Sequence, residues 1–326
     1  MLTDKFGRTH NYLRISLTDN CNFRCSYCMP DACHSFLPRN KLMNAGEIER
    51  ISAEFIKLGV TKIRLTGGEP LLRKDFEEII NRLSKFPVEL LLTTNGLLIN
   101  KYLETIISAG ISTVNVSLDS LNPETFFKIT QHNRFHHVWN NILLLLKNNI
   151  RVKINTVAVK GYVENEIFDF INLTKELPLH VRFIEFMPFN GNKWNFTKVV
   201  TSESLLQLVT KEYDIVKLRD EPNATAKKFK VIGNEGTFAF ITTMSNQFCS
   251  DCNRLRLTAE GKIKNCLFGK EEFDILSLHR NGKSIVDLIQ QAVRNKQSAM
   301  GGQFEKGYEH TDASTIYNRS MVSIGG

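Results

Sequence analysis

The sequence predicts an α/β fold built on parallel strands. Over the first 190 residues, short segments rich in Val, Ile, Leu and Thr alternate with segments whose apolar residues recur at helical spacing. Strands that alternate with helices form parallel units with right-handed crossovers. We count six such units, whereas a closed eight-unit barrel takes roughly 250 residues. The first half therefore forms either an incomplete barrel or an open, doubly wound sheet.

Each predicted strand is short and is bounded by Gly, Asn, Asp or Pro, and the intervening helices carry start signals. Asp75 is predicted to cap a helix that has Glu78 at its third position. Asn122 precedes Pro123, a pair typical of a helix start. A third helix is expected over Val163–Leu177. The six predicted strands are Tyr12–Leu17, Lys62–Thr66, Glu89–Thr93, Thr113–Leu118, Val152–Val159 and Val181–Phe186.

The chain changes character after Pro188, which predicts a second region. We expect a short helix over Ser202–Tyr213, a hairpin over residues 227–243 and an amphipathic helix over Ser284–Lys296. Residues 297–326 are rich in glycine and polar residues and are predicted to form a mobile tail. We therefore divide the chain into residues 1–190 and residues 191–326.

Composition excludes several classes of protein. The chain has 326 residues, 42% hydrophobic and 23% charged, which is typical of a globular protein. Its longest aliphatic run, Ile142–Leu146, is far shorter than the roughly 20 residues that cross a bilayer. Residues 1–14 carry no apolar export segment. We expect a cytoplasmic protein that does not bind membranes.

Seven cysteines and a net charge of +8 are the two unusual features. Reducing cytosol keeps thiols free, so a disulfide framework is not expected. Six of the cysteines form two triplets at opposite ends of the chain, and Cys33 is left over. Because no cysteine lies between Cys33 and Cys249, the two triplets predict two separate sites.

The N-terminal triplet, Cys21, Cys25 and Cys28, follows the first predicted strand with the spacing C-x3-C-x2-C. Three thiolates on one tight loop can hold three irons of a four-iron cluster and leave the fourth iron open for chemistry. The alternatives are a chance grouping and a zinc site with His34 as fourth ligand, although six residues after Cys28 is an unusual spacing for zinc.

This loop resembles that of the radical S-adenosylmethionine superfamily, whose signature has an aromatic residue before the last cysteine, here Tyr27. Other superfamily features follow in order at predicted strand ends, in residues 67–70, 117–119 and 184–188. Loops at the C-terminal ends of parallel strands meet on one face and build the site. The resemblance implies that the open iron binds S-adenosylmethionine, with contacts from Tyr27, Gly68, Ser117 and Met187.

The C-terminal triplet, Cys249, Cys252 and Cys266, has the spacing C-x2-C-x13-C. A zinc ribbon needs a fourth Cys or His two or three residues after Cys266, and the sequence has none there. Arg254 and Arg256 lie between these cysteines. On an extended segment they point to the same side and suit a polyphosphate, although a solvated basic strand is the alternative.

Within the superfamily, the second triplet resembles the GTP 3′,8-cyclase family, which acts first in molybdenum cofactor biosynthesis, and the match runs nearly end to end. The resemblance implies an incomplete (β/α)6 TIM-type barrel, with a C-terminal cluster-binding region that covers the open side. It implies two [4Fe-4S] clusters, the second of which binds guanine, and a functional Gly325-Gly326 tail. The implied contacts to GTP are Arg14, Lys62, Arg64, Thr93, Lys153, Arg182, Arg254, Leu255 and Arg256.

The implied reaction is a radical one. Reductive cleavage of S-adenosylmethionine gives a 5′-deoxyadenosyl radical that removes the ribose 3′ hydrogen of GTP. C3′ then attacks C8, and a final reduction gives (8S)-3′,8-cyclo-7,8-dihydroguanosine 5′-triphosphate. The resemblance also implies a homodimer, a flavodoxin- or ferredoxin-like electron donor, and transfer of the product to cyclic pyranopterin monophosphate synthase.

Two other functions compete with this interpretation. A radical enzyme that modifies a peptide or RNA commonly has more C-terminal cysteines and lacks the Arg-x-Arg pair. A zinc-containing nucleic-acid-binding module would use the net charge of +8, but the marked basic residues lie on the predicted strands, so we expect no nucleic-acid partner. The chain departs from the family pattern at Gln131, His132 and Ser320, and around Cys33 and His34. None of these departures touches a cluster ligand.

Overall fold

The first half of the chain alternates strands and helices, as predicted, and each strand end falls within one residue of its expected place. The strands are β1 (Tyr12–Ser16), β2 (Lys62–Thr66), β3 (Glu89–Thr94), β4 (Thr113–Ser117), β5 (Arg151–Ala158) and β6 (His180–Glu185). The helices are α1 (Ala45–Lys57), α2 (Phe76–Leu83), α3 (Ile99–Ser108), α4 (Pro123–Thr130), α5 (Phe135–Lys147) and α6 (Val163–Glu176).

The second half contains shorter elements. The predicted hairpin over residues 227–243 is confirmed, because β8 and β9 pair antiparallel. The elements are α7 (Ser202–Glu212), β7 (Ile215–Lys217), β8 (Ala226–Val231), β9 (Thr237–Ile241), β10 (Arg254–Leu257), β11 (Lys262–Lys264), β12 (Phe273–Asp274), α8 (Ile275–Arg280), α9 (Val286–Arg294) and α10 (Met321–Ile324). Single 3-10 turns are η1 (Arg39–Lys41), η2 (Pro70–Leu72), η3 (Phe196–Lys198), η4 (Cys249–Asp251) and η5 (Met300–Gly302).

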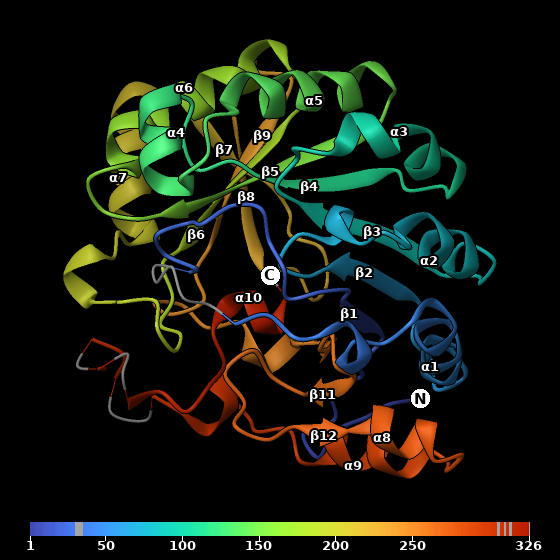
Figure 1. Ribbon diagram of the computed structural model, residues 1–326. Helices are drawn as coiled ribbons and strands as arrows, with labels where there is room; N and C mark the ends of the chain where they lie inside the picture. The colour runs from blue at the N-terminus through green and yellow to red at the C-terminus, as the bar shows by residue number, and fades with distance from the viewer. Residues whose placement is uncertain (30–34, 305–306, 310, 313–314, 326) are drawn as a thin grey trace.

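The computed structural model describes residues 1–29, 35–304, 307–309, 311–312 and 315–325, and in these residues the strands form one curved, 12-stranded sheet (Figure 1). The order is β12-β11-β10-β1-β2-β3-β4-β5-β6-β9-β8-β7. The central run from β10 to β9 is parallel throughout, so two C-terminal strands extend the six predicted ones. Because the end strands β12 and β7 do not pair within the described residues, the predicted incomplete barrel is confirmed.

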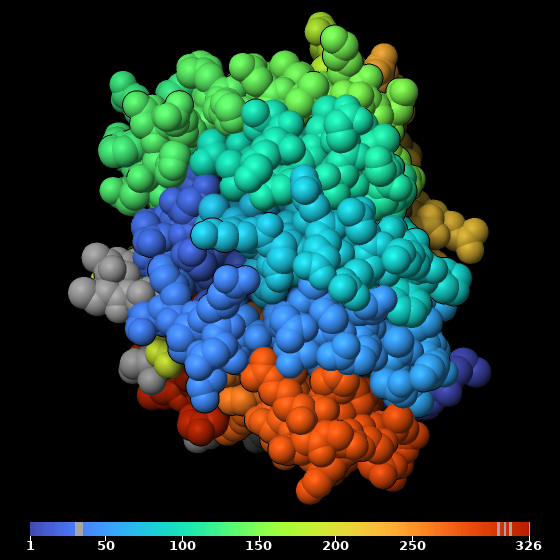
Figure 2. All heavy atoms as spheres, turned by 45° about the vertical axis from the view of Figure 1, so that its right-hand side comes forward, coloured from blue at the N-terminus to red at the C-terminus, as the bar shows by residue number. Residues whose placement is uncertain are grey.

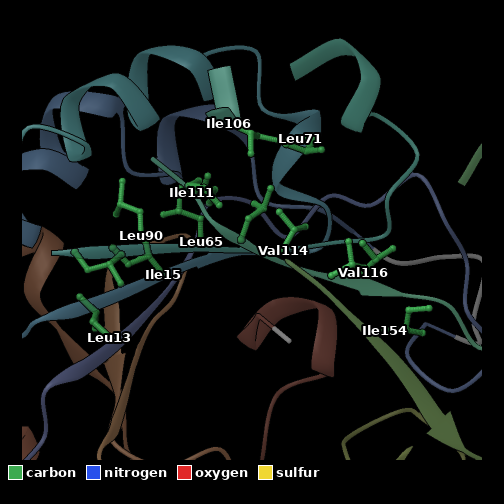
Figure 3. Packing of buried hydrophobic residues seen from close by; sticks show 14 of the residues in the cluster. Leu13, Ile15, Leu65, Leu71, Leu90, Ile106, Ile111, Val114, Val116 and Ile154 are labelled. Atoms are coloured by element: carbon green, nitrogen blue, oxygen red, sulfur yellow. The ribbon is translucent and has the colours of Figure 1, made fainter. Parts of the chain in front are cut away.

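The two faces of the parallel strands differ in chemistry. Every second side chain is apolar and packs beneath the helices, for example Leu13, Leu65 and Val114, which are fully buried (Figure 3). The residues between them, such as Arg14, Arg64 and Asn115, therefore point to the inner face of the curve. Burial of the apolar set stabilises the sheet, and it leaves the polar set facing the site.

Two helix starts were predicted from capping residues, with different outcomes. The Asn122 side chain accepts hydrogen bonds from the Glu124 and Thr125 amides, at 2.9 and 3.0 Å, as predicted. Asp75 also precedes its helix, but the predicted capping hydrogen bond is wrong. Its carboxylate is instead held by the Arg73 guanidinium, at 2.7 Å through each oxygen, and a charge-assisted pair outcompetes a cap.

The end of the predicted mobile tail packs into the fold, although Tyr317 before it is 71% exposed. Val322 and Ile324 are 3% and 1% exposed, and α10 and the C-terminus lie within the curve of the sheet (Figure 1). Two helices far apart in sequence meet on the outside, where α8 packs beside α1 (orange against blue in Figure 2) and Arg280 pairs with Glu47 at 2.7 Å. Among the described helices, none has the length and apolar character needed to cross a membrane.

Candidate active site

The first cysteine triplet lies on the loop that follows β1, and this loop is fixed to α4. The backbone amides of Arg24 and Ser26 donate to the last carbonyls of α4, each at 2.9 Å. Phe23 is buried, and its ring packs edge-on against Phe126 with centroids 5.8 Å apart. The other side of Phe23 meets the ring of His132, at 4.9 Å, so this departure from the family pattern contacts the cysteine loop directly.

The Gly-Gly-Glu-Pro turn after β2 packs on the same loop from the other side. The Gly68 amide donates to the Thr18 carbonyl at 2.6 Å, and a Cβ on Gly68 would lie 2.3 Å from the Asn20 carbonyl oxygen. Only glycine permits this approach. Glu69 is 1% exposed and accepts hydrogen bonds from the Thr94 hydroxyl and the Asn95 amide, both at 2.7 Å. The ends of β2 and β3 are thereby joined next to Cys21.

Asp119, at the end of β4, anchors the last part of the loop. Its carboxylate accepts from the Tyr27 hydroxyl at 2.7 Å and from the Val157 amide at 2.8 Å. Burial raises the pKa of Asp119 to about 6, although both hydrogen bonds oppose the shift. Tyr27 therefore connects the cysteine loop to β4 and β5 through its side chain.

The three thiols of the first triplet have raised pKa values. Burial, with the nearby Glu69 carboxylate, raises the pKa of Cys21 to about 11. Burial and the neighbouring Cys21 and Asp119 raise the pKa of Cys28 to about 12, and similar causes raise that of Cys25 well above its usual value. Mutually repelling thiolates in a buried site are stabilised by metal cations, which fits an iron–sulfur cluster at this loop.

The same loop lines a concave pocket that extends over the strand ends. This pocket brings together the predicted ligands of the first cluster, all four predicted S-adenosylmethionine contacts and one predicted GTP contact. These residues are Cys21, Cys25, Tyr27, Cys28, Gly68, Thr93, Ser117 and Met187. The pocket also takes in the side chain of Asn155, whose amide oxygen is buried and has no hydrogen-bond partner among the described residues.

The second triplet lies on two segments, η4 and the turn after β11, and basic residues surround it. The guanidinium of Arg8 donates to the carbonyls of Cys249 at 2.8 Å and Ser298 at 2.6 Å, while it pairs with Asp4 at 2.6 Å. Burial alone would raise the pKa of Cys252, but Lys296 and Arg254 outweigh it and lower the pKa to about 6. A cysteine with a lowered pKa binds metals readily, so Cys252 beside Cys249 and Cys266 fits a second metal centre.

Within the described residues, no three His, Cys, Asp or Glu side chains are arranged to hold a single metal ion. Within each triplet, however, the thiols are close enough to shift one another's pKa. Besides burial, Cys21 and Cys28 raise the pKa of Cys25, and Cys252 and Cys266 raise the pKa of Cys249. A cluster of several irons spans a wider set of sulfurs than one ion does.

The inner face of the sheet carries a row of arginines in register. Arg14 on β1 pairs in the ladder with Arg64 on β2 and with Arg256 on β10. Neighbouring strands lie about 4.8 Å apart, so three guanidinium groups stand side by side. Arg64 donates to the Thr93 hydroxyl at 3.3 Å, which connects this row to the thiol pocket.

Lys153 and Arg182 complete the cationic face from β5 and β6. Burial, Arg182 and Arg64 lower the pKa of Lys153 to about 8, and burial with Arg64 lowers the pKa of Arg182 to about 9. Strands β2 and β6 are not neighbours, so the effect of Arg64 on Arg182 shows that the curved face converges on one space. Two nitrogens of Arg182, Nε and Nη2, are buried without a hydrogen-bond partner in the described residues. Unused donors in a positive field fit an anionic ligand.

Three of the predicted ligand residues are not seen with a free side chain on the inner face of the sheet. Leu255 points to the opposite face and is fully buried in the core, so its backbone is the part that faces the cationic residues, and its contact with GTP stays a prediction. Lys62 lies at the start of β2 and already pairs with Glu89 at 2.8 Å. Gly326 lies outside the described residues, as do Cys33 and His34.

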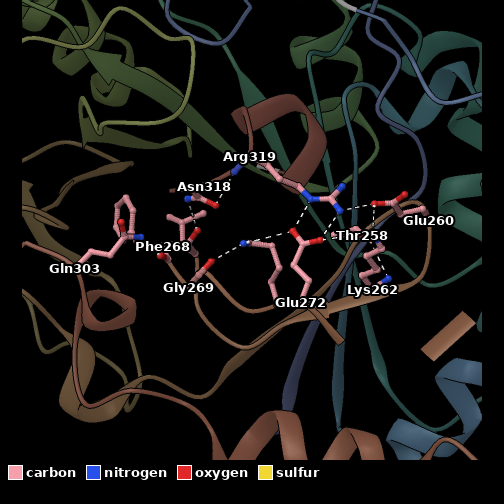
Figure 4. A network of polar contacts seen from close by, with 11 residues as sticks. Thr258, Glu260, Lys262, Phe268, Gly269, Glu272, Gln303, Asn318 and Arg319 are labelled. Carbon is pink, nitrogen blue, oxygen red and sulfur yellow. Dashed lines mark hydrogen bonds and ion pairs between the residues drawn. The ribbon is translucent and has the colours of Figure 1, made fainter. Parts of the chain in front are cut away.

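The tail reaches the cationic face. The Gly325 carbonyl accepts a hydrogen bond from Arg256 at 2.6 Å. Before α10, Arg319 is held between Glu272 and Glu260, and Asn318 donates to the Leu267 carbonyl at 2.9 Å (Figure 4). Leu267 follows Cys266, so the tail and the second cysteine turn are fixed to one another.

Fold and site together define a radical S-adenosylmethionine enzyme. The model of the Radical SAM superfamily matches residues 15–174, and that of Molybdenum Cofactor Synthesis C matches residues 179–301. The chain is 42% identical over its whole length to "GTP 3',8-cyclase, mitochondrial" of Arabidopsis thaliana, of which it covers 84%. It is 40% identical to "GTP 3',8-cyclase" of Desulforamulus reducens, with all of both proteins covered. The chain therefore belongs to the GTP 3′,8-cyclase family, and the predicted family and enzyme class are confirmed.

Other relatives are longer than this chain. It is 43% identical to "Molybdenum cofactor biosynthesis protein 1" of Mus musculus, and it spans about half (51%) of that protein. Among solved structures, Streptococcus suis SuiB bound to S-adenosylmethionine superimposes with a TM-score of 0.64 at 16% identity, covering 97% of this chain and 77% of SuiB. At that identity the likeness supports the fold alone.

Sequence reasoning missed several residues of the site. Glu69 and Asp119 lie in the segments 67–70 and 117–119 that the superfamily resemblance marked, but no role was predicted for either carboxylate, although each follows a predicted strand. Asp4, Arg8 and Lys296 had none, because they are far in sequence from the cysteines that they approach. The Arg8 guanidinium reaches Cys249 across 241 positions of the chain.

Proposed function

We propose that this chain converts GTP to (8S)-3′,8-cyclo-7,8-dihydroguanosine 5′-triphosphate, the first step of molybdenum cofactor biosynthesis. The proposal rests on one observation: the pocket lined by Cys21, Cys25 and Cys28 adjoins the basic residues on the inner face of the sheet. Thr93 lines the pocket and accepts from Arg64, and Asn155 lines the pocket opposite Arg182 in the ladder. A ligand on the cations therefore lies next to whatever binds the thiols.

In this proposal the first cluster is held by Cys21, Cys25 and Cys28, and S-adenosylmethionine is bound by Tyr27, Gly68, Ser117 and Met187. When bound, the reduced cluster and S-adenosylmethionine supply the radical chemistry. The chain contributes position: Asp119 fixes Tyr27, the Gly68 turn brings the loop before Cys21 close, and the pocket walls exclude water.

The second cluster is proposed to be held by Cys249, Cys252 and Cys266, next to the base of GTP. The triphosphate and ribose would contact Arg14, Lys62, Arg64, Thr93, Lys153, Arg182, Arg254 and Arg256, with the backbone of Leu255. Buried guanidinium groups that repel one another are stabilised by a polyanion, which is why Arg182 retains unused donors. The Gly325-Gly326 tail would close the space from the side of Arg256.

The remaining roles follow from the family. We propose a cytoplasmic homodimer, reduced by a flavodoxin- or ferredoxin-like donor, that passes its product to cyclic pyranopterin monophosphate synthase. We also propose that residues 1–190 bind S-adenosylmethionine and that residues 191–326 supply the second cluster.

The test is anaerobic incubation of the reconstituted protein with S-adenosylmethionine, GTP and dithionite. We expect 5′-deoxyadenosine and the cyclised nucleotide to form only when GTP is present, with about eight irons per chain. ATP in place of GTP is the matched control. Formation of 5′-deoxyadenosine without any dependence on GTP would argue for the competing peptide- or RNA-modifying function.

A further inference from the structure

Lys296 is a buried lysine with an unusual partner. It follows α9, is 2% exposed, and donates from Nζ to the Arg254 carbonyl at 2.8 Å. The same nitrogen lies 3.4 Å from the Sγ of Cys252, within hydrogen-bond distance for sulfur. Family motifs and the predicted nucleotide contacts give this residue no role.

Three buried cations, Arg8, Lys264 and Lys296, lie near the second cysteine triplet. Two of them pair with a carboxylate and the third does not. Arg8 pairs with Asp4 at 2.6 Å, and Lys264 lies 3.7 Å from Glu272. Within the described residues, no carboxylate lies within ion-pair distance of Lys296, whereas the Sγ of Cys252 lies 3.4 Å from its Nζ. A buried ammonium without a counter-charge is strongly unfavourable. Sulfur therefore takes the place that a carboxylate takes for Arg8 and Lys264.

We propose that Lys296 is a positioning residue of the second cluster: its ammonium donates a hydrogen bond to the Cys252 sulfur and makes the cluster easier to reduce. The inference rests on the proposed second cluster. Hydrogen bonds to ligand sulfurs and nearby positive charge favour the more negative, reduced state of an iron–sulfur centre.

The same ammonium also connects the cluster to the substrate face. Its second hydrogen bond goes to the carbonyl of Arg254, whose side chain is one of the proposed GTP contacts. Arg254 begins β10, and its neighbour on the same face, Arg256, holds the tail carbonyl. Lys296 thus fixes the relative position of a cluster sulfur and the strand that carries two of the proposed phosphate contacts.

The test compares K296M, K296R and K264M with the wild-type holoenzyme. Iron and sulfide are measured first, and the midpoint potential of the second cluster is then taken from a redox titration followed by electron paramagnetic resonance. A C25S background removes the signal of the first cluster. We expect K296M to shift the midpoint to a more negative potential and to lose one exchangeable-proton coupling to the reduced cluster. K296R should stay near wild type, and K264M should shift less than K296M, because Lys264 is paired with Glu272.

The outcomes separate the inference from the function on which it rests. An unchanged potential in a fully loaded K296M protein, or equal shifts in K296M and K264M, overturns the role of Lys296. If K296M loses about four irons while K296R keeps them, the charge and donor are needed even to hold the cluster, which supports the inference. If both variants lose those irons, packing alone is responsible and the inference fails. A wild-type protein with only about four irons would contradict the second cluster itself.

Discussion

The two cysteine triplets offer the same three ligands in opposite electrostatic surroundings. Near the first triplet the charged neighbours include the carboxylates Glu69 and Asp119. Burial together with Glu69 raises the pKa of Cys21 to about 11, and burial together with Asp119 raises the pKa of Cys25. Near the second triplet they are cations, and Lys296 and Arg254 overcome burial to lower the pKa of Cys252 to about 6.

The difference matches the proposed ligand of each site. S-adenosylmethionine carries a sulfonium and an ammonium, so a pocket with buried acids favours it, whereas GTP is a polyanion that an arginine-lined face attracts. In the proposed function, the cysteines supply the metal ligands of both centres, and the surrounding charges favour a different substrate at each.

Removal of either triplet should separate the two halves of the reaction, and this is the largest expected effect. We expect C25S to lose about four irons and all cleavage of S-adenosylmethionine, because the first cluster no longer assembles. C266S should also lose about four irons and all cyclised product, yet retain GTP-dependent cleavage of S-adenosylmethionine at saturating GTP, measured as 5′-deoxyadenosine, because the arginines still bind the triphosphate. Complete loss of cleavage in a folded C266S protein would show that the two centres do not act separately.

Arg182 tests the cationic side of the comparison. A charge-assisted hydrogen bond is worth roughly 1.5–3 kcal/mol, so R182M should weaken GTP binding by about 10- to 100-fold in calorimetry. R151M is the matched control, since Arg151 is exposed on the preceding strand. Binding of S-adenosylmethionine should stay unchanged in both variants. Equal weakening of both ligands by R182M would contradict the separation of the two charge environments.

Arg319 tests whether the tail depends on the second cysteine turn. R319M breaks the contacts with Glu260 and Glu272, and we expect roughly tenfold faster amide exchange at Ile324 and Gly325, corresponding to about 1.4 kcal/mol. R82M removes an arginine with two acidic partners, Glu49 and Glu78, on the helical surface and serves as control. Identical exchange of the tail in R319M and wild type would mean that α10 is held by its own packing.

His180 reports the positive field around Arg182 and Lys153. Burial, Arg182 and Lys153 lower its pKa from 6.5 to about 3, so the folded state favours the neutral ring. Its contribution to stability is complete above pH 6.5 and is lost as the pH falls from 6.5 towards 3. Between pH 7.5 and 4.5, the wild-type free energy of unfolding should fall by about 2 kcal/mol more than that of H180N. A parallel pH dependence in denaturant titrations of both proteins would contradict the shift.

Much of the fold was predictable because parallel strands have a clear local signature. Short runs rich in β-branched residues between turn residues gave all six strands of the first half, and the two glycine-flanked runs after residue 226 gave the hairpin. The prediction that failed concerned the hydrogen-bond partner of one side chain. Asp75 was expected to cap α2 and pairs with Arg73 instead, since local sequence does not reveal which of two nearby donors wins.

The sequence by itself determined the chemistry. The spacing of the first triplet places three sulfurs on one short loop, and the alternation along each strand puts Arg14, Arg64 and Arg182 on the side opposite the apolar residues. Tertiary structure decided the charge around each triplet and the register between strands. Arg256 joins Arg14 only because β10 pairs in parallel with β1, and Lys296 reaches Cys252 across 44 residues. Such contacts depend on how the helices and strands pack in space, and no local pattern in the sequence encodes them.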